Sequence, residues 1–283
     1  MNTIISFNDF ISSRKTILNS DKPKWLIIGN ESSDMDSIVS SLVYGFYKHL
    51  QCHDSYNVIP ISSNSKQNVM LRRDVLEWLQ RKFDIDVAND LVYLDGIEMC
   101  FDDCRFWENM RVALNPHRAR NKWIACHVPE IIDHREITCR FPPGQLETES
   151  IQTVSSCSTL VAQCVLTDRS LPQLETLLRL LYGAILLDTD CLGLSNNRTT
   201  KMDIGVSSEI DQLLSLSKDQ RFEIDQKEDN FHVTNEKVIF PLDLTTAPRL
   251  QGAAHALASV IYYIIVSCEC QLNILKIQFE QNM

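Results

Sequence analysis

The sequence predicts an α/β fold with a doubly wound, mostly parallel sheet. Short apolar runs of strand length alternate with stretches of helical apolar spacing through the first two thirds of the chain. This alternation is typical of a parallel sheet, because the crossover between two parallel strands is usually a helix. Several of the apolar runs also end in acidic or histidine residues. In a parallel sheet such ends meet at one edge, where ligands bind.

The period of the apolar residues places the expected elements. Apolar runs predict strands at residues 25–28, 58–61, 91–94, 111–114 and 130–132. Apolar spacing of three and four residues predicts helices at residues 7–18, 38–46, 71–83, 158–166 and 174–187. The residues of helix 71–83 that are expected to face the core are Leu71, Val75, Leu76 and Leu79.

The turn between the first strand and its helix holds two carboxylates, Asp34 and Asp36, among several serines. Carboxylate, amide and hydroxyl oxygens at the end of a strand suit a hard divalent cation such as Mg²⁺ or Mn²⁺. The structural alternative is that Asp34 caps the helix and Asp36 is a solvated acid in its first turn. The pattern alone leaves both interpretations open.

Other strand ends carry the same chemistry. Asp95 follows the third expected strand, and Asp133 and His134 follow the fifth. Together with the first turn they predict a metal-dependent site at the carboxyl edge of the sheet. The alternative is that acidic residues are simply common in loops.

Length and composition bound the class of protein. The chain has 283 residues, which allows one large domain or, in better accord with typical domain sizes, two. Its apolar content of 44% and charged content of 23% are ordinary for a soluble globular protein. The net charge of −10 argues against a nucleic-acid partner held by a broad basic surface.

The cysteines and the amino terminus predict a cytoplasmic, reducing environment. Ten cysteines are scattered along the chain. The two close pairs, Cys100 with Cys104 and Cys268 with Cys270, lack zinc-ribbon spacing. Residues 1–20 contain no apolar core of a secretory signal. We therefore expect free thiols.

An uncharged segment near the carboxyl terminus allows two interpretations. Residues 250–268 carry no charge, and their part from Val260 to Val266 is strongly apolar. A membrane tail anchor would have about this length. Because Gln251, His255 and Ser259 interrupt the segment, we favour a buried helix or strand.

Several segments together resemble the exopolyphosphatase and prune-like branch of the DHH phosphoesterase superfamily. They are Gly29–Ser37 (G-N-E-x-x-D-x-D-S), Leu71–Asp74 (L-R-x-D), Ile131–Arg135 (the name-giving motif in its D-H-R form), Val154–Leu160 (similar to V-G-S-C-S-T-L) and Gly183–Thr189 (G-x-I-L-L-D-T). Their order and spacing fit the branch over about residues 20 to 230. The joint match is highly specific.

The resemblance implies a hydrolase with two Mn²⁺ or Mg²⁺ ions that acts on pyrophosphate, short polyphosphates or cyclic nucleotides. It places Asn30 at the leading ligand position of the first motif. Asp34 and Asp188 match ligands of one metal, and Asp36 and His134 match ligands of the other. Two cations about 3.5–4 Å apart can lower the pKa of a shared hydroxide and stabilise the leaving oxygen.

Three arginines are candidates for contact with the phosphate groups. Arg135 stands where the second His of the family motif would contact phosphate, and it could clamp the phosphate oxygens. Its alternative is an ion pair with Asp133 or Glu136. Arg72 and Arg73 could also face the substrate. For these two we favour a solvated helix face or a pair with Asp74.

The chain departs from the family at the second motif. Ala113 occupies the position of the metal-bridging Asp, about twenty residues before Asp133. Without that carboxylate the second ion should bind weakly. The nearby residues that could substitute for it are Asp95, Asp102, Asp103, Asn115 and His117. None of them is at the family position.

The chain also departs from the family after residue 200. The resemblance implies that residues 1–200 form the DHH domain. Residues 201–283 would then hold a linker helix, reaching to about Leu216, and a truncated or diverged remnant of the second domain. In the family this domain closes over the metals, so its loss would leave the site wet.

Two hypotheses from different classes follow. The first is a prune-like phosphohydrolase acting on a small phosphate-containing substrate, with an activity that the two departures would lower. The second is an inactive relative that keeps the fold and acts through protein partners. Asp34, Asp36, His134 and Asp188 favour the first, whereas Ala113 and the shortened second domain favour the second. A nuclease or cyclic-dinucleotide esterase is a third option, against which the D-H-R form argues.

Overall fold

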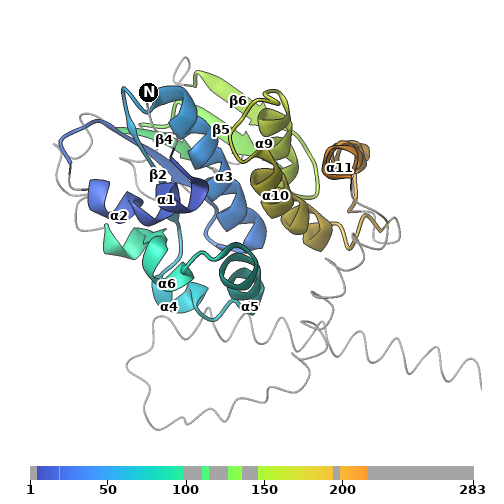
Figure 1. The fold of residues 1–283 in the computed structure, drawn as a ribbon, viewed down its shortest axis with the longest axis horizontal. Coiled ribbons are helices and arrows are strands. Elements are labelled where there is room, and N and C mark those ends of the chain that lie inside the picture. The colour runs from blue at the N-terminus through green and yellow to red at the C-terminus, as the bar shows by residue number, and fades with distance from the viewer. Residues whose placement is uncertain are drawn as a thin grey trace, which may run out of the picture. The chain divides into compact units, whose positions relative to one another are not determined.

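A parallel sheet organises the computed structural model (Figure 1). Its strand order among the described residues is β3-β2-β1-β4-β5-β6, and every pair of neighbours is parallel. The strands are β1 (Lys24–Ile28), β2 (Asn57–Ser62), β3 (Val92–Tyr93), β4 (Met110–Leu114), β5 (Glu130–Asp133) and β6 (Thr148–Ile151). The predicted parallel α/β sheet is therefore confirmed.

The structure describes residues 5–18, 20–97, 110–114, 127–135, 146–193 and 198–215, the segment 110–114 by its backbone alone. All of them lie within one compact unit. The helices are α1 (Phe7–Ser12), α2 (Arg14–Ile17), α3 (Met35–Cys52), α4 (Lys66–Val69), α5 (Arg73–Val75), α6 (Val87–Asp90), α9 (Cys157–Leu166), α10 (Leu174–Asp188) and α11 (Lys201–Leu214). A π-helical stretch, η1 (Leu76–Lys82), follows α5, and a short 3₁₀ turn, η2 (Leu94–Gly96), follows β3.

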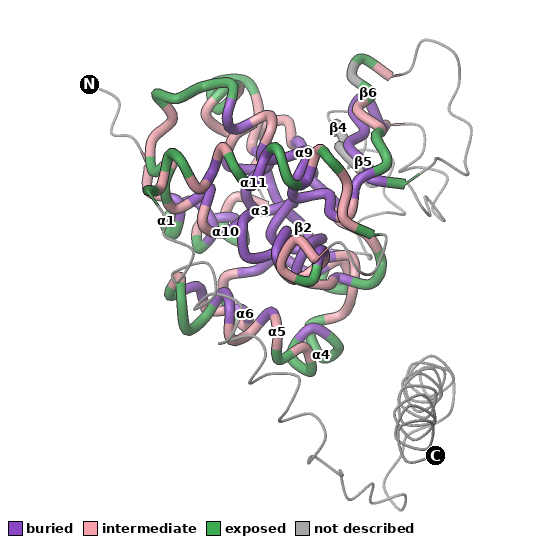
Figure 2. Tube along the Cα trace, turned by 90° about the vertical axis from the view of Figure 1, so that its right-hand side faces the viewer, coloured by how far each residue is buried: buried purple, intermediate pink, exposed green. Residues whose placement is uncertain are grey.

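Helices α3, α9 and α10 pack against one another on one face of the sheet (Figures 1 and 2). Their apolar residues recur every three or four positions, and this spacing gives each helix a buried stripe. In α3 the stripe includes Ile38, Leu42 and Phe46, and in α10 it includes Leu181 and Ile185. These side chains belong to the larger of two apolar clusters.

The opposite face of the sheet is apolar too. Successive residues of a strand point to opposite faces, so Leu26 and Ile28 of β1 lie on the face that Ile27 does not. Leu26 and Ile28 pack with Ile59 and Ile131 in a second buried cluster. A sheet buried on both faces is what a doubly wound fold requires.

Tight packing joins α10 to η1. Trp78 donates a hydrogen bond from its indole N–H to the carbonyl of Leu180 at 3.3 Å. Its ring lies so close to Gly183 that a Cβ at that position would be 2.1 Å from a ring carbon. Gly183 therefore marks the point where the backbone of α10 meets the indole.

Three details of the predicted elements were wrong. The helix expected at residues 7–18 is broken at Ser13 into α1 and α2. Within the helix expected at 71–83, Leu71 lies outside the helical residues and is 74% exposed, although it was expected to face the core. Strand β6 was not predicted, because Thr148–Ile151 has three polar residues before its single apolar residue and contains no apolar run.

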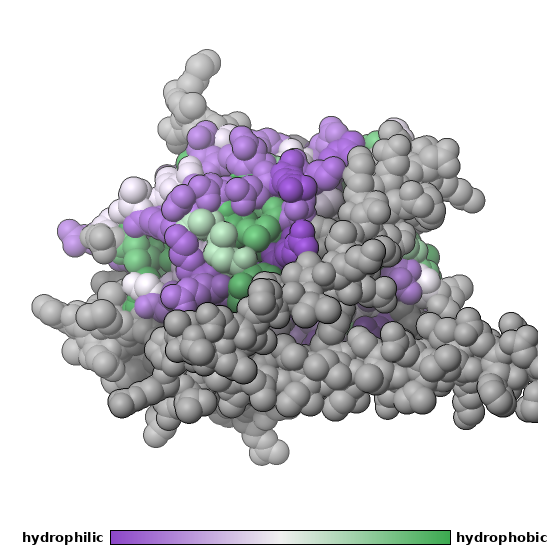
Figure 3. All heavy atoms as spheres, turned by 90° about the horizontal axis from the view of Figure 1, so that it is seen from below, coloured by the Kyte–Doolittle hydropathy of each residue, from purple (hydrophilic) through white to green (hydrophobic). Residues whose placement is uncertain are grey.

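The surface carries few large apolar side chains. Among the described residues the exposed large hydrophobic side chains are Met70, Leu71, Ile204 and Leu213. Figure 3 shows one face on which apolar surface is surrounded by hydrophilic side chains.

The carboxyl-terminal predictions are only partly covered by the structure. The linker helix is present as α11, which begins with a capping box between Thr200 and Asp203. The described part of the chain contains no helix long and apolar enough to cross a membrane. Residues 250–268 lie outside the described residues, as does the rest of the expected second domain. The division at residue 200 stays a prediction.

Candidate metal and phosphate site

The candidate site lies at the carboxyl ends of β1 and β5. These two strands flank β4, and the order of the sheet reverses between β1 and β4. A crevice forms at such a switch point, because the connections on its two sides run to opposite faces of the sheet. The loop after β1 brings the first motif to this edge, and the end of β5 brings the D-H-R motif.

A glycine lets the loop after β1 approach α3 closely. A Cβ at Gly29 would lie 2.2 Å from Oγ of Ser37 and 2.9 Å from its carbonyl oxygen, so any larger residue would displace the first turn of α3. The Ser37 hydroxyl accepts a 2.8 Å hydrogen bond from the N–H of Asn30. Ser33 is buried in the left-handed region, with φ at 45°. The turn is therefore held in one conformation.

Asp34 caps α3. Its carboxylate accepts a 3.0 Å hydrogen bond from the N–H of Ser37 and a 2.6 Å hydrogen bond from the hydroxyl of Ser32. The alternative that the sequence left open for Asp34 is therefore what this structure describes. A cap keeps one carboxylate oxygen at the sheet edge and does not exclude a second role as a ligand.

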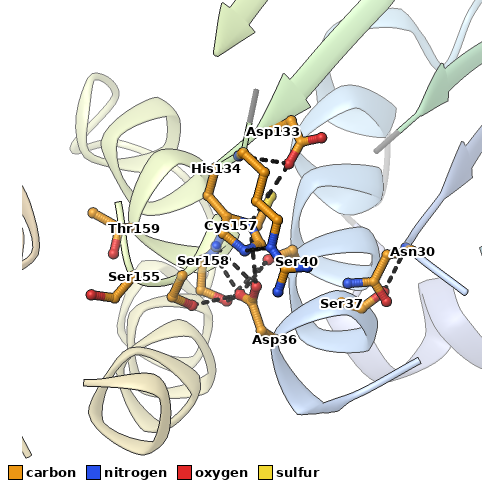
Figure 4. Close-up of polar contacts among 12 residues, drawn as sticks. Asn30, Asp36, Ser37, Ser40, Asp133, His134, Ser155, Cys157, Ser158 and Thr159 are labelled. Atoms are coloured by element: carbon orange, nitrogen blue, oxygen red, sulfur yellow. Dashed lines mark hydrogen bonds and ion pairs between the residues drawn. The ribbon is translucent and has the colours of Figure 1, made fainter. Parts of the chain in front are cut away.

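Asp36 is buried, with 5% of its surface exposed, and is not the solvated acid of the alternative interpretation. Its carboxylate lies against the first turn of α9 (Figure 4). It accepts hydrogen bonds from the N–H groups of Cys157 and Ser158 at 2.9 and 2.7 Å. The hydroxyls of Ser156 and Ser158 donate to it at 2.6 and 2.7 Å. Asp36 thus lies at the start of α9, where N–H groups and the positive end of a helix dipole point outward.

His134 lies above Asp36 in Figure 4 and is 7% exposed. Its Nδ1 is 4.0 Å from the nearer carboxylate oxygen of Asp36 and 3.8 Å from Asp133, which is too far for a hydrogen bond. Its Nε2 accepts a 3.1 Å hydrogen bond from Nε of Arg135. Nδ1 is therefore a buried polar atom that has no hydrogen-bond partner among the residues that the structure describes.

Asp188, at the end of α10, completes the acidic group. Burial and the negative charges of Asp36 and Asp34 raise the pKa of this carboxyl to about 8. A hydrogen bond from Ser156 and the charge of Arg135 act in the opposite direction. Asp34 and Asp36 at the start of α3 thus lie close enough to Asp188 at the end of α10 for their charges to disfavour its ionisation.

Arg135 is held beside Asp133 and His134 by two hydrogen bonds. Its backbone N–H donates a 3.0 Å hydrogen bond to Asp133, and its Nε binds His134. The side chain is exposed. Of the two ion pairs considered as alternatives, Glu136 lies outside the described residues, and Asp133 receives a hydrogen bond from the Arg135 backbone.

Two other predicted site residues, Arg72 and Arg73, lie away from Asp36. Arg72 pairs with Asp74 at 3.4 Å, as the structural alternative proposed, and its Nη1 donates to the carbonyl of Ser32 in the first motif at 3.3 Å. Arg73 is exposed. Neither is brought to the Asp36 group.

Asn30 also has a structural role, in the turn after β1. Its side-chain oxygen accepts hydrogen bonds from the hydroxyl of Ser32 at 2.6 Å and from the N–H of Ser33 at 3.1 Å. Figure 4 shows it beside Ser37, apart from His134 and Asp36.

The strand register locates the position of the missing carboxylate. Ala113 of β4 pairs with Ile27 of β1 and with Glu130 of β5. A cleft of about 380 Å³, part of it open to solvent, is lined by residues of β1, β5, α3 and α9, among them Ile27 and Ile132. The structure therefore has space between the strands that flank β4.

The substitutes considered for that carboxylate are only partly covered by the structure. Asp95 is exposed and follows β3, at the far edge of the sheet from β5. The four other candidates, which are Asp102, Asp103, Asn115 and His117, lie outside the described residues.

The donor set fits a hard cation chemically, although its geometry is not that of a closed site. In the part of the chain that the structure describes, no three His, Cys, Asp or Glu side chains are close enough to hold an ion. Asp36 and Asp34 are engaged by hydrogen-bond donors instead. Mutually repelling carboxylates and the unpartnered Nδ1 of His134 are nevertheless what a bound cation would relieve.

The motif V-S-S-C-S-T-L contains residues that bind Asp36. This role was not predicted from the sequence. Ser156, Cys157 and Ser158 hold Asp36, and the thiol of Cys157 is fully buried, which raises its pKa well above the usual value. The signal for this role was present as three small polar residues at the start of an expected helix. What the sequence could not show was the acid that they bind.

The chain is similar to several known proteins. No family model matches the chain. The chain is 31% identical over 191 residues to Exopolyphosphatase PRUNE1 of Rattus norvegicus, a match that covers 64% of this chain and 39% of that protein. It is 30% identical over 217 residues to Exopolyphosphatase PRUNE1 of Mus musculus, covering 72% of this chain and 44% of that protein. The matches thus span less than half the length of these relatives.

A solved structure is also similar. It is the crystal structure of a Methanococcus jannaschii protein described as a family II inorganic pyrophosphatase. The match has a TM-score of 0.46 and 18% identity and covers 71% of this chain and 60% of that chain.

Proposed function

Because this chain is a relative of the prune-type exopolyphosphatases in the DHH phosphoesterase superfamily, we propose that it hydrolyses phosphoanhydride bonds with the help of a divalent cation. The proposed substrates are pyrophosphate and short-chain polyphosphate, and the proposed cation is Mn²⁺ or Mg²⁺. No nucleic-acid or membrane partner is part of this proposal.

The observation that carries the proposal is the convergence of Asp34, Asp36 and Asp188. These residues come from the turn after β1, the first turn of α3 and the end of α10. Burial, together with the negative charges of Asp36 and Asp34, raises the pKa of Asp188 to about 8. Such mutual repulsion costs stability in the free protein, so a fold that keeps it is expected to use a cation there. Perturbed acids at the carboxyl edge of a parallel sheet are typical of active sites.

Residues of the chain would bind both the cation and the phosphate. Asp34, Asp36, Asp188 and His134 would hold the cation, which supplies charge to polarise a phosphate and to lower the pKa of bound water. Arg135 is exposed and has a planar guanidinium with several donors, so it could bind phosphate oxygens as charge develops on them. His134 would face the cation through Nδ1, because its Nε2 already accepts the hydrogen bond from Arg135.

Two observations favour a second candidate, an inactive relative that acts through protein partners. Ala113 offers no carboxylate at the bridging position. Asp36 is already bound by the first turn of α9, which leaves less of its charge for an ion. In this candidate the acidic group is kept for the stability of the fold.

A hydrolysis assay separates the two candidates. The full chain is incubated with Mn²⁺ or Mg²⁺ and with pyrophosphate, tripolyphosphate, tetrapolyphosphate or cyclic AMP, and the release of phosphate or AMP is followed. We expect release of phosphate from at least one phosphoanhydride.

The matched control is Asp188→Asn. The amide has the shape of the carboxylic acid that Asp188 forms in the free protein, so the variant should fold while losing a ligand. Equal release by this variant and by the wild type would exclude the proposed hydrolase and favour the inactive relative.

A further inference from the structure

A second buried carboxylate lies on the other side of the segment that holds Asp36. Asp203 of α11 is fully buried. It accepts hydrogen bonds from the hydroxyl of Thr159 at 2.6 Å and from the N–H of Ser155 at 3.1 Å. On its own helix it also accepts from the N–H and hydroxyl of Thr200 at 2.8 and 2.7 Å. These donors keep the pKa of Asp203 below its usual value although burial raises it.

The donors of five consecutive residues are thus divided between two acids. Ser155 and Thr159, the first and the last of the five, bind Asp203. The three residues between them bind Asp36 through two N–H groups and two hydroxyls. Figure 4 shows Ser155 and Thr159 on the side of this segment away from Asp36.

We propose that Asp203 is a positioning residue for Asp36 and acts through residues 155–159. The inference rests on the proposed function, because the position of Asp36 affects catalysis only if Asp36 is a cation ligand. Asp203 fixes the segment at both of its ends, so the middle of the segment cannot turn without breaking a bond to a buried charge. Hydrogen bonds to charged groups are the strong ones, and a donor left unpaired in the interior is costly.

This arrangement also links the site to α11. Asp203 closes the capping box at the start of that helix, so the same carboxylate fixes the helix start and residues 155–159. The link needs no contact between α11 and the substrate.

Two threonine variants of the full chain test the inference. Thr159→Val removes the hydroxyl that binds Asp203 from the side of α9, whereas Thr200→Val removes a hydroxyl that binds the same carboxylate from the side of α11. We expect Thr159→Val to lower the affinity for Mn²⁺ roughly tenfold, as loss of an outer-sphere partner of a ligand does. Thr200→Val and Thr159→Ser should stay close to the wild type.

A second measurement does not depend on the cation. Hydrogen exchange of the amides of residues 37–40, at the start of α3, is followed in protein treated with a chelator. If the link acts through Asp36, exchange there should be faster in Thr159→Val and unchanged in Thr200→Val. These amides are distant in sequence from both substitutions.

The outcomes separate this inference from the proposed function. If the wild type binds no Mn²⁺, the proposed function fails, and faster exchange confined to Thr159→Val would still support the link. Equal effects of the two valine variants, or wild-type exchange in Thr159→Val, would overturn the link. If Thr159→Val does not fold, Asp203→Asn, which has the same shape, replaces it with the same expected result.

Discussion

Ser158 binds Asp36 twice, through its backbone N–H and through its hydroxyl, with both donors 2.7 Å from the same carboxylate oxygen. This makes Asp36 the cap of a helix that begins more than a hundred positions later in the chain. Ser156, the N-cap residue of α9, makes no cap hydrogen bond with its own side chain. Asp36, which belongs to α3, caps α9 in place of Ser156.

We therefore expect Asp36→Asn to be costly for the fold as well as for any activity. The amide brings two donors into a place where five donors already point, so several would be left unpaired. The free energy of unfolding should fall by about 3 kcal/mol. Asp34→Asn is the matched control and should cost less than about 0.5 kcal/mol, because Asn caps a helix about as well as Asp. Urea unfolding followed by circular dichroism measures both, and equal costs would contradict the role given to Asp36.

Ala113→Asp should restore the bridging carboxylate. The register places residue 113 between Ile27 and Glu130, and a cleft lies between the strands that flank β4. We expect Mn²⁺ affinity, measured by calorimetry, to rise at least roughly tenfold, since a carboxylate between two cations offsets their repulsion. Ala113→Asn has nearly the same size without the charge and should leave the affinity unchanged. A similar rise in both variants would show that the charge is not the cause.

Asp188→Asn should change how stability depends on pH in protein treated with a chelator. The folded pKa of Asp188 is about 8, above the ordinary carboxyl value of 3.8. The folded state therefore holds a proton that the unfolded state releases between these two values, and stability falls as the pH rises from 4 to 8. The variant lacks this proton, so its midpoint of thermal unfolding should decline less over that range. Parallel curves for the two proteins would argue against the raised pKa.

His49 should give the opposite dependence. Burial and the positive charges of Arg14, His53 and Lys22 lower its pKa to about 4. As the pH falls from 6.5 to 4, His49 binds a proton in the unfolded chain but not in the folded chain. The folded state therefore loses stability over this range. His49→Gln should flatten the acid side of the stability curve, which thermal unfolding at several pH values would show. An unchanged acid slope in the variant would mean that His49 is not the group responsible.

Gly29→Ala should disturb the site through sterics alone. Its Cβ would overlap Oγ of Ser37 at 2.2 Å, so the first turn of α3 must move. We expect a loss of about 2 kcal/mol in the free energy of unfolding. Gly205→Ala, in α11, meets nothing within 4 Å and should instead stabilise the protein by about 0.5–1 kcal/mol. Chemical denaturation of the two variants provides the comparison, and a neutral Gly29→Ala would disprove the close approach.

Much of the fold was predictable from apolar periodicity. The strands at β1, β2 and β5 and the helices at α9 and α10 are long enough, and apolar enough, for their period to be clear. Leu71 was misplaced because the chain enters α5 only at Arg73 and then winds as a π-helix, which shifts the helical period. Strand β6 was missed because its residues carry no apolar run.

The candidate site was predictable in its residue types and not in its contacts. The turn of Asp34 and Asp36 and the strand end at His134 could be found from motif and position. That Asp36 binds the first turn of α9 depends on the packing of α3 against α9, which no local pattern encodes. For Asp203 a signal did exist, since Thr200 and Asp203 have the spacing of a capping box, but the pattern said nothing of Thr159.

The strand order has a consequence for how the chain assembles during synthesis. Strand β1 is made first. β2 can pair with it early and β3 can then pair with β2, because both follow closely in the chain. Its other edge must wait for β4, so the backbone of Lys24–Ile28 stays open on one side while much of the domain is still missing. Long-range parallel pairing of this kind forms slowly, and an apolar open edge can pair with another chain. Aggregation during expression is therefore expected to begin at this edge.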